Sequence, residues 1–242
     1  MSPEKSSLRS RLTFLEHLEE LRWRLWASLA TIGIFSTAAY FFSKPLLNFL
    51  IHPLSQATGG NVYFHTPYEA FVVHLEVSLL AGILVASPVI FTELWLFLAP
   101  GFHRRERKVA ILLTLFSVLL FLGGAAFAIW ILIPWSLNFF LSFQTDTLRP
   151  LIGVGPYFSF LVWMVLISGV IFDLPVVVLG LVKAGILSQA ALRKSRKGVI
   201  VSLFILAAVI TPSGDPATQI FFTLPLILLY EVCVFVARWV EK

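Results

Sequence analysis

Long uncharged stretches constrain this chain more than any other feature of its sequence. Residues 109–145 contain no Asp, Glu, Lys or Arg over 37 positions, and residues 25–42 contain none over 18 positions. A helix of about 20 apolar residues is long enough to cross the hydrocarbon core of a bilayer. Charged residues make up only 13% of the 242 residues, whereas soluble domains carry about 25%. We therefore predict an all-α integral membrane protein.

Six transmembrane helices are predicted in a single polytopic domain that covers residues 1–242. An amphipathic N-terminal segment over residues 1–24 precedes spans at 25–42, 71–98, 109–134, 156–182, 198–211 and 216–237. Pro134 is expected to end the third span, and the fifth span is short enough to require a locally thinner bilayer. A cleavable signal peptide is the alternative for the first apolar run, but the long leader with four Glu residues argues against it.

Basic residues lie almost entirely on one side of the predicted topology. Of the 18 Lys and Arg residues, 16 fall in the N-terminal segment, in the loops after spans two and four, and in the C-terminal tail. Only Lys44 and Arg149 lie in the opposite loops. By the positive-inside rule, both termini are cytoplasmic. The net charge of +5 is therefore a topology signal, and no nucleic-acid partner is expected.

Two long loops are predicted on the outer side, over about residues 43–70 and 135–156. Trp135 and the three Phe residues that follow it indicate an aromatic belt, with a helix on or near the outer membrane surface. An extension of the third span explains the same residues equally well.

The sequence lacks the motifs of the common enzyme classes. It has no Walker A loop, no H-E-x-x-H and no G-x-S-x-G. Cys233 is the only cysteine, which excludes an intramolecular disulfide and a cysteine-based zinc cluster. We predict that the protein is not an enzyme and needs neither a cofactor nor a metal.

Two carboxylates stand out on the predicted cytoplasmic surface. Glu20 lies within the helical pattern of residues 13–24, and Glu106 lies among four basic residues of the 100–108 loop. An intrahelical pair with Arg24, four residues on, is one explanation of Glu20, and a topology-setting loop is one explanation of Glu106. The alternative is that the two carboxylates bind a ligand with two guanidinium groups, because guanidinium binds carboxylate bidentately.

Four acidic residues fall inside the predicted spans. A carboxylate near the middle of a bilayer is costly, so it is expected to face a cavity, a partner or a water path. Asp173 lies deepest, and Pro175 should loosen the helix just after it. Glu76, Glu93 and Glu231 lie nearer the span ends, where contact with interfacial water is an equal explanation. A proton-coupled small-solute permease would use such residues, and it is the alternative function.

Two stretches on the predicted cytoplasmic side carry recognisable patterns. Residues 17–24 match H-L-x-E-L-R-x-R, and residues 97–107 are similar to F-x-x-P-[AG]-L-x-x-x-E-[RK]. Together with the stretches 66–71, 86–95 and 230–231, these patterns resemble those of the TatC family, the signal-receptor subunits of the twin-arginine protein translocase. Asp173 stands where the family commonly has Glu, and residues 211–219 resemble T-P-P-D-P-x-S-Q with one extra residue and with Thr218 in place of Ser.

The resemblance implies a concave, glove-like bundle with structured outer-face loops in the bacterial inner membrane. It implies binding of Arg-Arg signal peptides of folded precursors, export driven by the protonmotive force, single-span TatA and TatB type partners, and a homo-oligomer in the receptor complex. The implied signal-peptide-binding residues are Glu20, Leu21, Arg22, Phe97, Pro100, Glu106 and Arg107. The intramembrane transport candidates are Glu76, Asp173 and Glu231, and the outer-face and partner-contact candidates are Pro53, Phe71, Pro212, Asp215 and Gln219.

Overall fold

The computed structural model describes residues 3–60, 62–98, 107–145, 151–183, 185, 187–210 and 216–240. Over these ranges the chain is helical and has no β-strand, which confirms the all-α prediction. The helices are α1 (Pro3–Phe41), α2 (Ser43–Ala57), α3 (Glu69–Leu98), α4 (Arg107–Phe127), α5 (Ile133–Leu141), α6 (Val154–Phe172), α7 (Leu174–Lys183), α8 (Gln189–Lys194), α9 (Arg196–Ile210) and α10 (Pro216–Val240).

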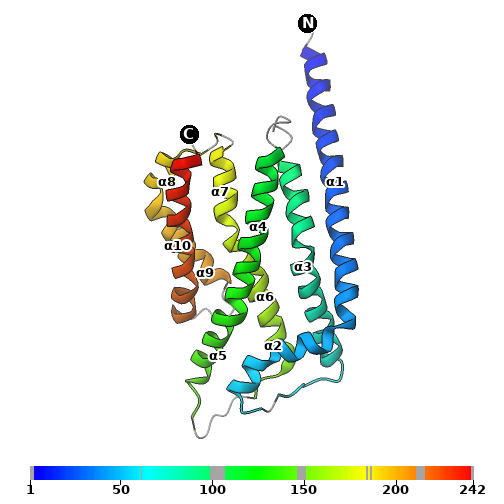
Figure 1. Cartoon of the computed structure of the whole chain (residues 1–242), viewed down its shortest axis with the longest axis vertical. Helices are drawn as coiled ribbons and strands as arrows, with labels where there is room; N and C mark the ends of the chain where they lie inside the picture. The colour runs from blue at the N-terminus through cyan, green and yellow to red at the C-terminus, as the bar shows by residue number, and fades with distance from the viewer. Residues whose placement is uncertain are drawn as a thin grey trace.

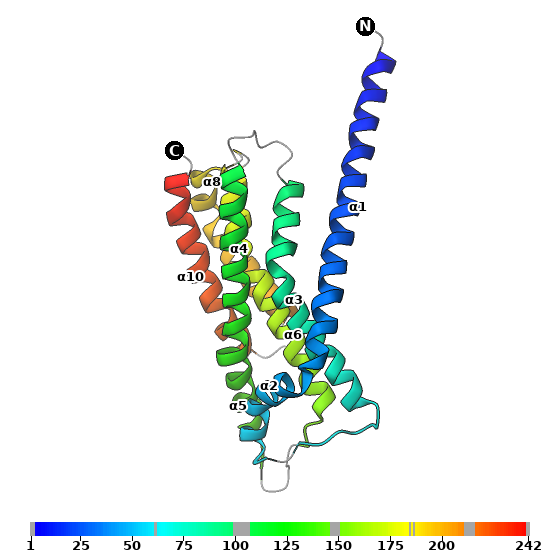
Figure 2. The same ribbon diagram turned by 45° about the vertical axis from the view of Figure 1, so that its right-hand side comes forward.

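Helix α1 combines the N-terminal segment and the first apolar run, and α2 then leaves it at an angle of 83°. Pro45 explains the break, because it cannot donate a hydrogen bond to the Phe41 carbonyl but fits the first turn of a new helix. We call the end of the bundle that holds both termini the terminal end, and the opposite end, which α2 crosses, the distal end (Figure 1). At the terminal end, α1 extends beyond the other helices and leans away from them (Figure 2).

Within the described residues, four helical segments are long and apolar enough to cross a membrane: Glu69–Phe97, Ile111–Leu141, Val154–Lys183 and Thr218–Trp239. The bent pair α1–α2 makes a fifth if it is counted as one span. At the place of the predicted fifth span, α9 has only 15 residues. Both α9 and α10 stop short of the distal end (Figure 1). The six-span topology therefore stays a prediction.

The third apolar helix does not end at Pro134 as the sequence suggested. A π-helical segment, Ala128–Leu132, joins α4 to α5, and the apolar segment continues to Leu141. Pro134 lies in the first turn of α5, directly after the wider π turn, where a proline is tolerated. Trp135 stacks on Phe221 of α10 with ring centroids 4.3 Å apart. The residues after Pro134 thus extend the third helix and pack against α10.

The fourth apolar helix is broken at one residue. Asp173 separates α6 from α7, and Pro175 is the second residue of α7. Pro175 has no N–H to donate to the Ile171 carbonyl, so the regular hydrogen-bond pattern stops there. This is the loosening that the sequence predicted.

Helix α1 packs chiefly along α3, α4 packs on α6, and α10 packs on α7 and α9. The α4–α6 contact depends on glycines. A Cβ at Gly124 would lie 2.6 Å from the Ser168 carbonyl oxygen, and one at Gly169 would lie 2.7 Å from the Phe121 ring. Small residues let membrane helices approach this closely. Large apolar side chains such as Ile111 and Leu119 remain exposed, as expected for a surface that faces lipid.

The distal end is held together by hydrogen bonds between α2, α6 and the segment 62–68. The buried Glu69 carboxylate accepts from the backbone N–H groups of His65 (2.6 Å), Thr66 (3.2 Å) and Gly155. Tyr157 donates its hydroxyl to the Leu50 carbonyl at 2.7 Å. The first long loop of the sequence prediction therefore contains a helix, α2, that is fixed to the bundle.

Candidate functional site

Arg24 joins two carboxylates at the terminal end. Its Nε and Nη2 donate to Glu20 Oε1 at 3.0 and 2.6 Å, and its Nη1 donates to Glu93 Oε2 at 2.7 Å. The side chains are partly accessible, with 23% of Arg24, 40% of Glu20 and 26% of Glu93 exposed. We call Glu20, Arg24 and Glu93 the terminal triad.

The terminal triad links α1 to the last two turns of α3. The intrahelical Glu20–Arg24 pair is the explanation that the sequence offered as an alternative to ligand binding, and the structure contains it. The contact with Glu93 was not predicted, because that residue lies 69 positions away along the chain. Two carboxylates and one guanidinium leave the triad with a net charge of −1. A further cation is therefore attracted to it.

The other predicted signal-binding residues are only partly covered by the structure. Leu21 is exposed, and the pair of Arg22 with Glu19 is loose, at 3.8 Å between exposed side chains. Phe97 is half-buried near the end of α3. Pro100 and Glu106 lie outside the described residues, and Arg107 is described only as the first residue of α4. The structure thus neither joins Glu106 to Glu20 nor separates them.

Asp173 is buried inside the bundle, with 5% of its surface exposed. Its Oδ1 atom has no hydrogen-bond partner among the described residues. Ser117 of α4 is close enough to act as a hydrogen-bonding partner of the Asp173 side chain. Trp95 of α3 donates its Nε1–H to Ser117 Oγ at 2.9 Å. The helix break thus places an acid beside a polar pair contributed by two other helices.

One carboxylate oxygen of Glu76 accepts a hydrogen bond, and the other has no hydrogen-bond partner within the described part of the chain. Ser159 of α6 donates to Glu76 Oε1 at 3.0 Å, and Glu76 Oε2 is buried without a partner there. Phe71 and Glu76 both line an open groove of about 520 Å³ between α1 and α3. An acid at such a position in an apolar helix is a candidate for a functional role.

Glu231 forms an ion pair with Arg196, and both side chains are more than two-fifths exposed. It lies in the C-terminal half of α10, on a surface rather than in the bundle interior. This position agrees with the interfacial explanation considered from the sequence and separates Glu231 from the buried Asp173.

The partner-contact candidates that the structure describes belong to different helices. Pro53 belongs to α2 and lines a groove of about 590 Å³ that α2 forms with residues 129–138. Gln219 donates to the Phe204 carbonyl at 2.8 Å and so ties α10 to α9. Pro212 and Asp215 lie outside the described residues. These residues form no common surface in the described part of the structure.

Sequence comparison connects the chain to one family. The profile described as Sec-independent protein translocase protein (TatC) matches residues 16–225. The protein of that name from Magnetococcus marinus is 36% identical over 230 residues, which cover 94% of this chain and 84% of the relative. The one from Carboxydothermus hydrogenoformans is also 36% identical over 230 residues, which cover 95% of this chain and 94% of the relative.

Structure comparison gives the same result. A crystal structure described as the twin arginine translocase receptor TatC matches with a TM-score of 0.80 and 34% sequence identity. The match covers 93% of this chain and all of the other. The helical arrangement described above is therefore shared with that receptor.

Proposed function

Since the chain belongs to the TatC family and is a multi-pass membrane subunit of the Sec-independent translocase, we propose that it is the subunit that binds Arg-Arg signal peptides. It is a transport component and not an enzyme, and it works with other Tat subunits. The family membership favours this function over the small-solute permease suggested as an alternative.

The observation that carries the proposal is the terminal triad. Its net charge of −1 attracts a guanidinium, and Glu20 is the most exposed of its members. A carboxylate has about four acceptor positions, so it can bind a second guanidinium beside Arg24. Glu93 is the residue that sequence reasoning missed, and we propose that it helps to set the position of the Glu20 carboxylate through Arg24.

Glu106 is the proposed partner for the second signal arginine. Helix α3 ends at Leu98 and α4 begins at Arg107, and both ends lie at the terminal end of the bundle (Figure 1). The loop that carries Glu106 joins these two ends, and Glu93 lies in the last turns of α3. Pro100 and Arg107 are proposed to shape the same surface.

An exposed apolar strip on α1 suits the hydrophobic part of a signal peptide. Leu18, Leu21 and Leu25 recur at helical spacing, and 45%, 39% and 56% of their surfaces are exposed. Arg22 lies next to Leu21 on α1, and Phe97 lies one turn after Glu93 on α3. In this proposal the apolar strip binds the signal sequence next to the carboxylates that bind its arginines.

The remaining parts of the proposal concern the cell. The terminal end faces the cytoplasm in the bacterial inner membrane. TatA and TatB type subunits pack near Pro53, Phe71 and the hairpin of α9 and α10. The receptor complex contains several copies of this chain. The protonmotive force drives export, with Asp173 and Glu76 acting after signal binding. The 16 basic residues on the predicted cytoplasmic side support the orientation.

Site-specific cross-linking of an Arg-Arg signal peptide to the membrane-embedded protein tests the proposal. We expect the Glu20→Gln plus Glu106→Gln variant to lose at least about tenfold in cross-linking yield, because each charge-assisted hydrogen bond contributes about 1.5–3 kcal/mol. Glu19→Gln is the matched control, since Glu19 neighbours Glu20 but makes only the loose contact with Arg22. Undiminished cross-linking in the double variant would contradict the role assigned to these carboxylates.

A further inference from the structure

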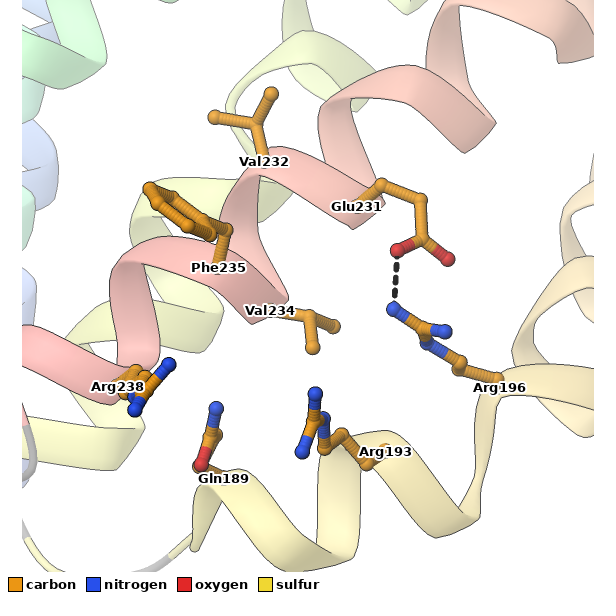
Figure 3. Close-up of a pocket in the computed structure, with 8 residues that line it drawn as sticks. All are labelled: Gln189, Arg193, Arg196, Glu231, Val232, Val234, Phe235 and Arg238. Carbon is orange, nitrogen blue, oxygen red and sulfur yellow. Dashed lines mark hydrogen bonds and ion pairs between the residues drawn. The ribbon is translucent and has the colours of Figure 1, made fainter.

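A pocket of about 400 Å³ opens at the terminal end, where α8 and the start of α9 meet the last turns of α10. It lies on a different part of the molecule from the terminal triad, which is formed by α1 and α3. Its polar and aromatic lining consists of Gln189, Arg193, Arg196, Glu231, Phe235 and Arg238 (Figure 3).

The pocket is held in shape by contacts between the three helices. Arg196 of α9 forms an ion pair with Glu231 of α10. The Tyr230 hydroxyl donates to the Leu192 carbonyl at 2.7 Å, which fixes α8 on α10. Glu231, Phe235 and Arg238 have the i, i+4, i+7 spacing of one helix face, so the face of α10 and the docked α8 enclose the same space.

The charges in the pocket are unbalanced. Three Arg residues and one Glu residue line it, and Glu231 pairs with Arg196. Arg193 and Arg238 form no ion pair with any residue that the structure describes. Their guanidinium groups approach the same opening from α8 and α10, with the Gln189 side chain between them (Figure 3). The pocket thus presents two uncompensated cations to a single anionic group.

One wall of the pocket is apolar and open to the surroundings of the bundle. Val232 and Phe235 are 49% and 64% exposed, and the neighbouring Trp239 is 73% exposed. Arg238 is the first charged residue after Glu231 on α10, and Trp239 is the kind of residue found at membrane interfaces. The pocket therefore lies where the apolar part of α10 meets the headgroup region. A soluble anion would bind to the arginines but would make no favourable contact with this apolar wall.

We propose that this pocket binds the headgroup phosphate of an anionic phospholipid. Arg193 and Arg238 hold the phosphodiester, and one acyl chain lies along Val232 and Phe235. Basic pockets between transmembrane helices are suited to anionic headgroups. The net charge of the pocket favours a phosphatidylglycerol or cardiolipin headgroup over a zwitterionic one, whose own cation would be repelled by the arginines.

Native mass spectrometry of the full-length protein, equilibrated with phosphatidylglycerol or phosphatidylcholine, measures this preference directly. We expect the wild-type chain to retain phosphatidylglycerol in preference to phosphatidylcholine. The Arg193→Gln plus Arg238→Gln variant should lower that preference about thirtyfold, since two basic side chains near the headgroups are lost. Lys194→Gln plus Lys197→Gln is the matched control, because it removes the same charge from exposed neighbours outside the pocket.

The proposal would be overturned if the double arginine variant kept the preference for phosphatidylglycerol, or if the lysine control lost that preference equally. It would also be overturned if inorganic phosphate displaced the bound lipid at equal concentration. Should the double variant fail to accumulate in membranes, Arg238→Gln alone gives the same readout, because Arg238 lies at the exposed end of α10 and has no described ion pair. The single variant should lose a clear part of the preference for phosphatidylglycerol that the double variant loses.

Discussion

Arg24 and Arg22 differ by two positions on α1 but have different roles in stability. Arg24 bonds to both Glu20 and Glu93, whereas Arg22 makes only the loose contact with Glu19. We expect Arg24→Gln to lower the free energy of unfolding by about 1–3 kcal/mol, because two partly buried carboxylates lose their shared partner. Arg22→Gln should change it by less than about 1 kcal/mol.

Thermal unfolding in one detergent measures both variants. Adding Glu93→Gln to the Arg24→Gln variant should recover part of the loss, because one of the two unpaired carboxylates is then neutral. Equal shifts for Arg22→Gln and Arg24→Gln would show that the terminal triad has no special role in stability.

Asp173 is expected to act after signal binding. Asp173→Asn keeps the size of the side chain but removes its ionisable group, so export of a reporter precursor should fall strongly while signal-peptide cross-linking stays near the wild-type level. Ser168→Ala is the control, since Ser168 is equally buried on the same apolar segment and cannot ionise. A parallel loss of cross-linking in Asp173→Asn would move this residue into the receptor site.

The contacts of individual side chains were predictable only where the two partners are near in sequence. The Glu20–Arg24 pair follows from helical spacing, and the depth of Asp173 follows from its place in an apolar run. The contacts of Arg24 with Glu93 and of Arg196 with Glu231 depend on how separate helices pack. No local pattern contains that information.

The α4–α6 contact offers a test at the scale of helices. A Cβ at Gly124 would lie 2.6 Å from the Ser168 carbonyl oxygen, whereas one at the adjacent Gly123 would meet nothing within 4 Å. We expect Gly124→Ala to destabilise the protein by about 1–3 kcal/mol, because the two helices must move apart. Gly123→Ala should instead be neutral, or stabilising by up to about 1 kcal/mol, because Ala favours the helix. Thermal unfolding that shows the same sign for both changes would contradict this packing.

Helix boundaries were predictable where charge or proline closes an apolar run. The run 71–98 corresponds to α3 at Glu69–Leu98, and the break expected near Asp173 and Pro175 lies between α6 and α7. Helix α2 was missed because Asn48, His52 and Pro53 interrupt its apolar residues, so that no apolar run reaches the length of a span. The extension to Leu141 was only one of two equal explanations from the sequence, because Pro134 normally ends a helix and the π turn that accommodates it has no local sequence signal.

The uneven distribution of basic residues predicts the orientation of the whole molecule. Gln144 lies near the distal end and Lys194 lies at the terminal end, and both side chains are exposed. Each can be replaced by Cys to provide a labelling site. In intact cells, a membrane-impermeant maleimide should label Gln144→Cys and leave Lys194→Cys unlabelled; permeabilisation should expose both. Native Cys233 is buried, so the unmodified chain is a low-background control. The reverse labelling pattern would mean that the terminal end faces outward.

In the proposed function, the terminal triad affects how firmly a signal arginine is held. Glu20 keeps its bond to Arg24, so an arriving guanidinium shares the carboxylate with a cation on the same helix. The two guanidinium groups repel each other, which lowers the affinity for the arriving one. Affinity differences between closely related complexes lie mostly in the dissociation rate, so we expect this repulsion to speed the release of the signal. When the signal leaves, Glu20 is still paired with Arg24, and the triad does not pass through a state with an unpaired carboxylate.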